Sequence, residues 1–306
     1  MCERLLKKIQ SVHEFHEKDV EQGVERTYMY YKTGSHNIHT HKQSADILIT
    51  NTWKKMLFLD SNLQSTTQDE VIYHTSLVHP IMDALQNKEN ILILGGGEGA
   101  TAREVLRWAP VTRVTMVDYD RELVDLLKGH GKEWSLGAFE DPRLTIKYED
   151  AWEFMKQADA YDGVIIDLTD PSLLKEHWED LLENVLQCVK LRKGGFVMNA
   201  GLYIPWDTQR ISKLKEIVEN LCIRNPEYKY SIYTSMIPSF NGEWAFIAVY
   251  HKGRFMKDPE KLEILPDWIR RGVRILENKY ISTSISTAPD LRKITITNSK
   301  LDCSIV

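Results

Sequence analysis

The sequence predicts an α/β protein with a doubly wound, mostly parallel sheet, helices on both faces, and a small β-rich unit in front of it. Two observations lead to this fold class. After residue 90, short apolar strand patterns alternate with helical patterns, which is typical of parallel sheets. Before that point, residues 25–64 contain only short β patterns. We therefore predict an N-terminal helix and small β domain in residues 1–70 and a larger α/β domain in residues 71–306.

Composition narrows the function classes. The chain has 306 residues and a net charge of −5, whereas a dedicated nucleic-acid binder usually carries a basic stripe. No apolar run has the length of a membrane span, and the first residues lack the apolar core of a signal peptide. The four cysteines, Cys2, Cys188, Cys222 and Cys303, show no paired short spacing. We expect a cytoplasmic protein that binds neither nucleic acid nor membranes and that mildly favours a cationic ligand.

The N-terminal unit begins with residues 3–20, which have the spacing of an amphipathic helix. Three β patterns follow, at residues 25–33, 45–50 and 54–60. Asn51-Thr52 predicts a hairpin turn between the last two patterns. Residues 69–85 then return to helical spacing, and Pro80 is expected to kink or interrupt that helix.

The first part of the larger domain alternates between strands and helices. Strands are expected at residues 91–94, 113–118, 144–148, 163–167 and 195–199. Helices are expected at residues 99–108, 120–128, 150–157 and 176–190. Two more β patterns lie within residues 229–250, and residues 252–306 form a C-terminal extension to which the sequence assigns no role.

The most informative segment is residues 91–100, where a buried strand ends in three glycines, an acid and a helix start. Glycines in such a turn let a ligand approach the backbone, and the helix N-terminus offers unpaired amide donors. Gly95, Gly97 and Gly99 are therefore candidate nucleotide contacts. Glu98 is unusual, because a carboxylate in this loop repels phosphate and attracts a cation.

Acidic side chains follow successive predicted strands, and the carboxyl ends of parallel strands meet at one edge of a sheet. Asp118 lies 21 residues after Gly97, the usual distance for an acid that accepts both ribose hydroxyls. The alternative role for Asp118 is a helix cap. Asp150 could accept from an adenine amino group, cap the helix that follows, or do both.

Asp167 and Asp170 form the most telling pair. These acids stand three residues apart at the end of a buried strand, next to Pro171, and they concentrate negative charge. A turn with an Asx cap is the alternative interpretation. The functional interpretation is that they bind an ammonium group and take its proton, because an amine attacks only through a free lone pair. Neighbouring like charges also raise the pKa of one carboxylate toward a useful range.

The histidines give weaker indications. His36, His39 and His41 lack an acid or a cysteine that would complete a metal set, so we predict no metal site there. His74 and His79, in the helix after the β unit, are expected to be satisfied structural histidines.

With these motifs together, the sequence resembles the polyamine aminopropyltransferases, the family of spermidine, spermine and thermospermine synthases. The matching stretches are residues 57–80, 91–108, 117–120, 149–155 and 161–171. The similarity runs from about residue 44 to residue 250. It is greatest to the thermospermine type, which also has His after the Tyr at position 73. The combination is specific, whereas the glycine loop alone is not.

The resemblance implies a Rossmann-like catalytic domain of the class I methyltransferase type, a homodimer, and no metal or permanently bound cofactor. The co-substrate would be decarboxylated S-adenosylmethionine. Its aminopropyl group would pass to a polyamine, with release of 5′-methylthioadenosine. The acceptor would be spermidine, giving thermospermine or spermine, or putrescine, giving spermidine.

The resemblance also implies roles for the matched residues. Glu98 would hold the aminopropyl ammonium, Asp118 the ribose and Asp150 the adenine, while Asp167 would be the base or electrostatic partner of the attacking amine. The other donor-site residues would be Gln64, Gly95, Gly97, Gly99, Tyr119 and Ala151. The other acceptor-site residues would be Tyr73, His74, Asp170, Phe240 and Trp244. The chain departs from the family pattern at Ala45, in the shortened segment after Pro171, at Asn199 and at Phe240.

Three other functions stay open. An S-adenosylmethionine-dependent amine N-methyltransferase could use the same scaffold, although Glu98 would repel the carboxylate of that donor. A binding or regulatory paralogue would keep the fold without turnover. An NAD dehydrogenase would leave the Asp167–Asp170 pair unexplained.

Overall fold

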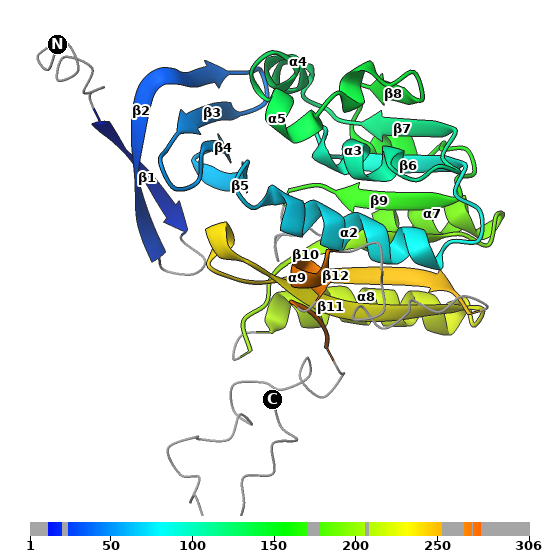
Figure 1. The fold of residues 1–306 in the computed structure, drawn as a ribbon. Coiled ribbons are helices and arrows are strands. Elements are labelled where there is room, and N and C mark those ends of the chain that lie inside the picture. Colours follow the sequence, from blue (N-terminus) through cyan, green and yellow to red (C-terminus); the bar gives the residue numbers. More distant parts are fainter. Residues whose placement is uncertain are drawn as a thin grey trace, which may run out of the picture.

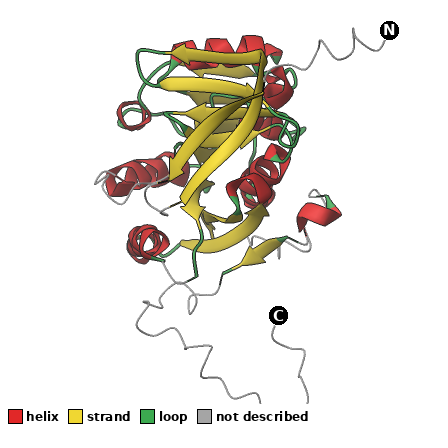
Figure 2. Cartoon of the chain, turned by 90° about the vertical axis from the view of Figure 1, so that its left-hand side faces the viewer, coloured by secondary structure: helices red, strands yellow, loops and turns green. Residues whose placement is uncertain are grey.

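The computed structural model describes residues 12–19, 24–169, 178–205, 208–252, 266–270 and 272–276. The strands form two sheets, a five-stranded one from the N-terminal residues and an eight-stranded one (Figure 1). Helices lie on both sides of the larger sheet, as Figure 2 shows. Within the described ranges, the helices are too short or too polar to cross a membrane.

The smaller sheet is antiparallel and has the order β1-β2-β3-β4-β5. Its strands are β1 (Val12–Asp19), β2 (Val24–His39), β3 (Ser44–Ile49), β4 (Lys55–Leu59) and β5 (Asn62–Thr66). The three predicted β patterns are confirmed as β2, β3 and β4. The predicted turn is also confirmed, because the Thr50 N–H donates to the Lys54 carbonyl at 2.7 Å around Asn51-Thr52. The boundary predicted near residue 70 falls after β5, and the division into domains stays a prediction.

The helix expected at residues 3–20 is wrong where the structure describes it, because β1 is a strand paired with β2; its first part lies outside the described residues. Alternate side chains of β1 face inward. The ring of Phe15 packs on that of Phe58 with centroids 4.5 Å apart, and buried Glu17 accepts from the Leu63 N–H at 2.8 Å. These partners are distant in the sequence, so tertiary pairing overrides local helical spacing.

The larger sheet has the order β13-β11-β12-β10-β9-β6-β7-β8. Its strands are β6 (Asn90–Gly95), β7 (Arg113–Val117), β8 (Leu144–Lys147), β9 (Gly163–Asp167), β10 (Gly195–Leu202), β11 (Tyr228–Ile237), β12 (Gly242–His251) and β13 (Val273–Ile275). The strands from β8 to β10 are parallel, and β12, β11 and β13 are antiparallel to their neighbours. All seven β patterns predicted within residues 91–250 are confirmed. The chain leaves β6 for β7 on one side and later returns to β9 on the other, so a ligand crevice is expected at the carboxyl ends of β6 and β9.

Helices connect these strands. The described α-helices are α2 (Glu70–Ala84), α3 (Ala100–Leu106), α4 (Arg121–His130), α5 (Lys132–Ser135), α6 (Ala151–Met155), α7 (Trp178–Lys190), α8 (Gln209–Arg224) and α9 (Asp267–Arg270). The short 3₁₀ helices are η1 (Ala138–Glu140) and η2 (Pro238–Phe240). The five predicted helices after the β unit are confirmed as α2, α3, α4, α6 and α7, and Pro80 lies within α2 without interrupting it.

Some elements were not predicted. The helix α8 was missed, although its buried residues Ile211, Leu214, Val218 and Leu221 recur at helical spacing. It packs against α7 and against β10 and β11. In the C-terminal extension, β13 adds an edge strand beside β11, and most of the extension lies outside the described residues.

The strand β6 shows how the sheet is buried on both faces. Its side chains Leu92 and Leu94 pack among residues of α6, α7 and α8, while Ile91 and Ile93 pack among residues of α2 and α3. All four are fully buried. Successive side chains of a strand point to opposite faces, so a continuous apolar run fits a doubly covered sheet. The carboxyl end of this buried strand carries the glycine loop.

Candidate active site

The loop after β6 turns sharply at two glycines. Gly95 and Gly96 have φ angles of 83° and 74°, which side chains rarely adopt. Gly95 pairs with Asp167 of β9, and a Cβ at Gly95 would lie 2.1 Å from the Asp167 carbonyl oxygen. The Gly96 N–H donates to the same oxygen at 3.1 Å. Glycine here allows β9 to bring Asp167 directly beside the loop.

The other predicted loop glycines have different surroundings. A Cβ at Gly97 would lie 2.8 Å from Asp118 Oδ2, so this position faces the carboxylate that follows β7. A Cβ at Gly99 would instead meet the ring of Phe139 at 2.7 Å. Gly95 and Gly97 line the cavity described below, whereas Gly99 is packed against a neighbouring segment.

Two hydroxyl groups hold the carboxylate of Asp167 at the end of β9. The Tyr73 hydroxyl, from α2, donates to Oδ1 at 2.9 Å. The Thr101 hydroxyl, from α3, donates to Oδ2 at 2.5 Å. Each carboxylate oxygen can accept further hydrogen bonds. The two hydroxyl groups therefore orient Asp167 and leave it able to accept from another donor.

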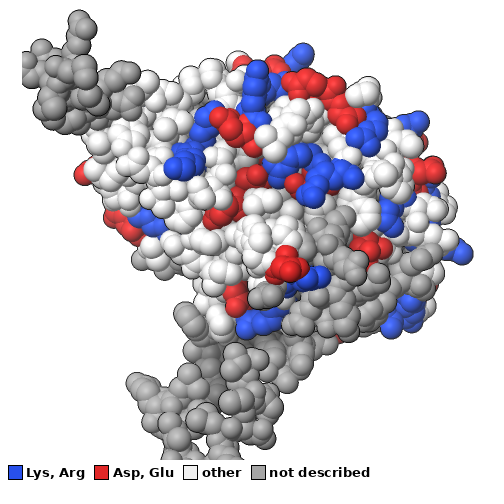
Figure 3. All heavy atoms as spheres, viewed as in Figure 1, with Lys and Arg blue, Asp and Glu red and all other residues white. Residues whose placement is uncertain are grey.

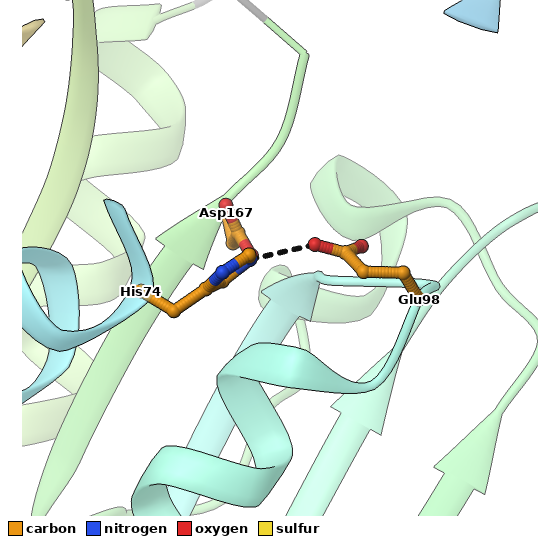
Figure 4. A group of neighbouring side chains, drawn as sticks. All are labelled: His74, Glu98 and Asp167. Atoms are coloured by element: carbon orange, nitrogen blue, oxygen red, sulfur yellow. Dashed lines mark hydrogen bonds and ion pairs between the residues drawn. The ribbon is translucent and has the colours of Figure 1, made fainter. Parts of the chain in front are cut away.

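A charged cluster lies next to Asp167. His74 Nε2 is 2.7 Å from Glu98 Oε1, and His74 Nδ1 is 2.8 Å from Glu70 Oε2. The side chain of His74 is 2% exposed and that of Glu98 15% exposed. Figure 4 shows His74 pointing from α2 toward Glu98, with Asp167 beside them at the end of its strand. Glu98 therefore borders the cavity, and His74 lies behind it.

The ligand atoms of His74, Glu98 and Asp167 lie within 4.8 Å of one another, a spacing that three metal ligands could share. A histidine ligand must offer a lone pair to the metal. Both ring nitrogens of His74 face carboxylate oxygens, so with Glu70 and Glu98 ionised both nitrogens donate and neither offers a lone pair. The arrangement favours a hydrogen-bonded ion cluster over a metal centre.

The histidines of the N-terminal unit form no such cluster within the described part of the chain. The rings of His36 and His130 are tilted by 36° to each other, with centroids 3.7 Å apart. His41 pairs with Glu122 at 2.8 Å. Both histidines therefore contact α4.

Asp118 follows β7 and lies beside the glycine loop. Its Oδ1 accepts from the Asp120 N–H at 2.9 Å. The cap of α4 is Asp120, whose Oδ1 accepts from the Leu123 N–H, while Thr40 and Gln43 donate to its Oδ2. Asp120, and not Asp118, is therefore the residue that caps α4, whereas Asp118 lines the cavity.

Asp150 follows β8 and caps the helix after it, which is one of the two roles that its position predicts. Its Oδ1 accepts from the N–H groups of Trp152 at 2.9 Å and Glu153 at 3.1 Å, which caps α6. The same residue lines the cavity. Capping therefore fixes the carboxylate at the cavity edge.

A cavity of about 380 Å³ covers the carboxyl ends of β6, β7 and β9. Five carboxylates line it, and no Lys, Arg or His does so among the residues described. They are Glu98, Asp118, Glu149, Asp150 and Asp167. On the outer face in Figure 3, acidic and basic side chains are interspersed. The concentration of negative charge is therefore a feature of the cavity and not of that face.

Burial and crowding raise the pKa of Asp167. Burial and then the charge of Glu98 raise this pKa to about 6, although the charge of His74 and the hydrogen bonds from Thr101 and Tyr73 lower it. A carboxyl group with this pKa exchanges its proton close to neutral pH.

Asp118 shows the same effect. Burial, with the charges of Glu98, Asp120 and Asp167, raises the pKa of Asp118 to about 6, against the lowering effect of the Asp120 backbone hydrogen bond. Two perturbed carboxyl groups in one cavity are typical of a functional site.

Aromatic side chains form another wall of the cavity. The ring centroids of Phe240 and Trp244 are 4.5 Å apart, and those of Tyr73 and Phe240 are 6.2 Å apart. The Trp244 indole N–H donates to Asn199 Oδ1 at 2.7 Å. The structure therefore brings together three residues that the sequence assigned to the acceptor site.

Only some of the remaining predicted site residues line the cavity. Gln64, Tyr119 and Ala151 line the cavity. His74 is not part of the cavity wall, because it lies behind Glu98. Asp170 lies outside the described residues, so the predicted pair with Asp167 is described only on the Asp167 side.

Sequence reasoning missed several residues of the site. Gln43, Leu63, Trp152 and Trp178 line the cavity, and Thr101 orients Asp167. Trp152 stands two residues after Asp150, so proximity to a motif could have found it. Leu63 and Thr101 lie inside the matching stretches 57–80 and 91–108, so the resemblance could have found them, whereas no local signal marks Gln43 and Trp178.

Comparisons with known sequences give a consistent result. The profile of the spermine/spermidine synthase domain matches residues 70–258. A polyamine aminopropyltransferase of Sulfolobus acidocaldarius is 40% identical over 202 residues, 63% of this chain and 63% of that protein. A polyamine aminopropyltransferase 2 of Pseudomonas aeruginosa is 36% identical over 213 residues, 66% of this chain and 58% of that protein. The chain thus spans less than two thirds of the length of either relative.

Solved structures support the fold. The spermidine synthase of Thermotoga maritima has a TM-score of 0.74 and 22% identity, covering 91% of this chain and 98% of that chain. A spermidine synthase in complex with the transition-state analogue AdoDATO has a TM-score of 0.75 and the same identity, covering 91% and 99%. The predicted fold class, a Rossmann-like mostly parallel sheet with a small N-terminal sheet, is confirmed.

Proposed function

The chain belongs to the spermine/spermidine synthase family, and on this premise we propose that it transfers an aminopropyl group from decarboxylated S-adenosylmethionine to a polyamine. The co-product is 5′-methylthioadenosine. The observation that carries the proposal is the charge of the cavity: five carboxylates line it, and no basic side chain does so among the residues described. The donor and the acceptor are both cations, so the cavity matches the charge of each.

We assign one side of the cavity to the donor. Glu98 binds the ammonium of the aminopropyl group, Asp118 the ribose hydroxyls and Asp150 the adenine amino group. The lining residues Gln64, Gly95, Gly97, Tyr119 and Ala151 complete this side. A hydrogen bond to a charged group contributes about 1.5–3 kcal/mol, so Glu98 supplies a substantial share of the donor affinity.

Asp167 is assigned to the chemical step. The acceptor amine arrives as an ammonium ion, and Asp167 takes one of its protons, which frees the nitrogen lone pair. This nitrogen attacks the methylene carbon next to the sulfonium sulfur. The carbon–nitrogen bond forms, the carbon–sulfur bond breaks, and its electron pair leaves with neutral 5′-methylthioadenosine. Placement of the two substrates in line supplies much of the remaining acceleration.

The main alternative is methyl transfer from S-adenosylmethionine. That donor keeps a carboxylate next to its ammonium group, and the proposed contact of Glu98 with this ammonium would bring the two carboxylates close together. The repulsion disfavours S-adenosylmethionine, whereas the decarboxylated donor presents only positive charge there. We therefore place aminopropyl transfer first.

For the acceptor we propose spermidine, giving thermospermine or spermine, with putrescine as the close variant. Tyr73, Phe240 and Trp244 support a polyamine, because aromatic faces suit both its methylene chain and its ammonium groups. Asp170 is retained as a second acid for the acceptor.

Two further expectations complete the proposal. We propose a homodimer, as the family resemblance implies. We also propose a reducing, cytoplasmic compartment, because Cys188 and Cys222 are free thiols.

The test is product analysis with purified protein. Each donor, S-adenosylmethionine or its decarboxylated form, is incubated with putrescine, spermidine or spermine, and the products are measured by mass spectrometry. We expect 5′-methylthioadenosine and a polyamine one aminopropyl group larger. Chromatography then separates spermine from thermospermine, which have the same mass.

The nucleoside product separates the alternatives. S-adenosylhomocysteine with a methylated amine would replace the proposal by N-methylation. No product from any pair, in a protein that still binds 5′-methylthioadenosine, would favour the non-catalytic paralogue.

A further inference from the structure

Charged side chains of alternating sign run from the cavity into the core between α2 and α3. Glu98 contacts His74, and His74 contacts Glu70. Arg103 donates to both carboxylate oxygens of Glu70 at 2.9 Å, and its Nε donates to Glu104 at 2.8 Å. Each buried charge therefore has a neighbour of opposite sign, which is the condition for charges to lie inside a protein.

The hydrogen-bond partners of His74 determine its protonation. Nδ1 lies 2.8 Å from both the carbonyl oxygen and Oε2 of Glu70, and Nε2 lies 2.7 Å from Glu98 Oε1. The Glu70 carbonyl oxygen can only accept, so Nδ1 donates; when Glu98 is ionised, its Oε1 can only accept as well, so Nε2 also donates. With ionised Glu70 and Glu98 on its two ring nitrogens, His74 is an imidazolium ion.

A second buried histidine on the same helix gives the opposite result. His79 Nδ1 accepts from the indole N–H of Trp108 at 3.0 Å, since an indole can only donate. His79 Nε2 then carries the proton and donates to Glu104 at 2.9 Å. His79 is therefore neutral, although it also pairs with a glutamate.

We propose that His74 is a positioning residue held as an imidazolium, which fixes the Glu98 carboxylate at the cavity wall and balances the negative charge of the site. This inference rests on the proposed function, because the purpose of Glu98 is to bind the donor ammonium. Glu70 and Arg103 act behind His74 and hold its charge in place. His74 acts through Glu98, because it contacts this carboxylate and is not among the residues that line the cavity.

The groups that face His74 explain why its charge matters. Glu70 approaches from α2, Glu98 from the glycine loop and Asp167 from β9. Burial lowers the pKa of His74, but the hydrogen bonds and charges of Glu70 and Glu98 outweigh burial and hold this pKa well above its usual value. The charge of His74 in turn lowers the pKa of Asp167.

Removal of the His74 charge has a specific consequence. Glu98, Asp118 and Asp167 would lie in one cavity without their buried counter-charge, so this group of carboxylates would take up a proton at a higher pH. A protonated group binds the donor ammonium less well. The effect disappears at alkaline pH, which a purely structural defect would not do.

The first test measures protonation directly in the wild-type protein. ¹⁵N NMR of the histidine side chains is recorded from pH 6 to pH 8. We expect both nitrogens of His74 to stay protonated throughout, while His79, the internal control, shows one protonated nitrogen. A neutral His74 at pH 7 would overturn the inference, and no substitution is needed to see it.

The second test compares the His74→Gln variant with the matched control His79→Gln. Calorimetry measures binding of decarboxylated S-adenosylmethionine and of 5′-methylthioadenosine between pH 6 and pH 9. We expect His74→Gln to lose about tenfold in affinity for the donor at pH 7 and to recover it at pH 9. Its affinity for 5′-methylthioadenosine, which has no ammonium group, stays unchanged, as do both affinities in His79→Gln.

The outcomes separate the two levels of the proposal. A wild-type protein that binds neither nucleoside would overturn the proposed function. A wild-type protein that binds both, with the same pH dependence in His74→Gln, would overturn only the role of His74. A loss that does not recover at pH 9 would also overturn it, since charge balance could not explain such a loss.

Discussion

The two sides of the cavity are built from different kinds of segment. On the side that we assign to the donor, Glu98, Asp118 and Asp150 each follow a parallel strand within a few residues. On the side that we assign to the acceptor, Tyr73 comes from α2 and Trp244 from the antiparallel strand β12. Asp167 lies between them, at the end of β9.

The charge of the cavity and the shape of its wall therefore depend on different parts of the fold. On the donor side, the positions of the carboxylates are determined by the strand topology, since every parallel strand ends at the same edge of the sheet. The acceptor side places aromatic rings by packing between elements that are distant in the sequence. We infer that the donor chemistry is fixed by the sheet, and that the acceptor can change through substitutions in the aromatic wall.

The largest effect is expected at the boundary between the two sides. In Asp167→Asn, the amide cannot take the proton of the ammonium, and its NH₂ group faces one of the hydroxyl donors, Tyr73 or Thr101. We expect kcat to fall by about 10²–10⁴-fold, the usual contribution of a general base. Product formation measures the loss, and binding of 5′-methylthioadenosine checks that the site persists.

The exposed acid Asp125, on α4, provides the control for this change. Asp125→Asn should keep full activity, because this side chain is 56% exposed and forms only surface ion pairs. If Asp167→Asn retained more than a tenth of the wild-type kcat, proton transfer to Asp167 would be ruled out.

The second effect concerns stability on the donor side. The pKa of Asp118 is about 6 when folded, against 3.8 for an ordinary Asp. The native state therefore binds this proton more tightly, and the free energy of unfolding falls as the pH rises from about 4 to about 6. At pH 7 Asp118 is ionised, and its burial lowers the free energy of unfolding by the full amount. A difference of two pKa units corresponds to about 3 kcal/mol.

Asp118→Asn removes this cost. We expect the free energy of unfolding, measured with urea, to rise by up to about 3 kcal/mol at pH 7 and to change little at pH 4. The same variant should bind 5′-methylthioadenosine more weakly, because it loses the acceptor for the ribose hydroxyls. An equal stability difference at both pH values would contradict the assigned cause.

The third effect separates the donors. In Glu98→Gln, the charged hydrogen bond to the donor ammonium is lost, and its worth of about 1.5–3 kcal/mol corresponds to roughly 10–100-fold in affinity. Calorimetry should show this loss for decarboxylated S-adenosylmethionine and none for 5′-methylthioadenosine. The ratio of the affinity for decarboxylated S-adenosylmethionine to the affinity for S-adenosylmethionine should also become smaller in this variant. Equal weakening of both nucleosides would mean that Glu98 only supports the loop.

The smallest effect is expected on the acceptor side. Phe240→Leu keeps apolar volume beside Trp244 but removes one aromatic face from the wall. Because a cation–aromatic contact contributes about 0.5–1 kcal/mol at an exposed site, we expect the KM for the polyamine to rise a few-fold. The KM for the donor should not change. A change in the donor KM alone would reverse our assignment of the two sides.

The strands could be predicted largely from local patterns. The apolar run of β6 and the acids after β7, β8 and β9 follow directly from the chain, and each lies where it was expected. The errors lie where a local pattern was overridden or overlooked. The edge strand β1 has helical spacing but forms a strand through its pairing with β2, and the amphipathic helix α8 was missed.

The prediction for the site shows the same division. Glu98, Asp118, Asp150 and Asp167 were found because each adjoins a strand end, and all four line the cavity. His74 was assigned to the acceptor through the family resemblance, whereas the structure places it behind Glu98. No sequence pattern distinguishes a buried imidazolium from a neutral histidine, because the difference lies in the partners of both ring nitrogens.

The sequence by itself determined the fold class, the order of the strands along the chain and the carboxylates at their ends, because strand alternation and strand-end turns depend on neighbouring residues. Only the tertiary structure decided which groups meet. The hydrogen bonds to Asp167 come from Tyr73 and Thr101, 94 and 66 residues away, and His74 meets Glu98 across 24 residues. Such contacts depend on how helices pack on the sheet, and packing is a property of the whole chain.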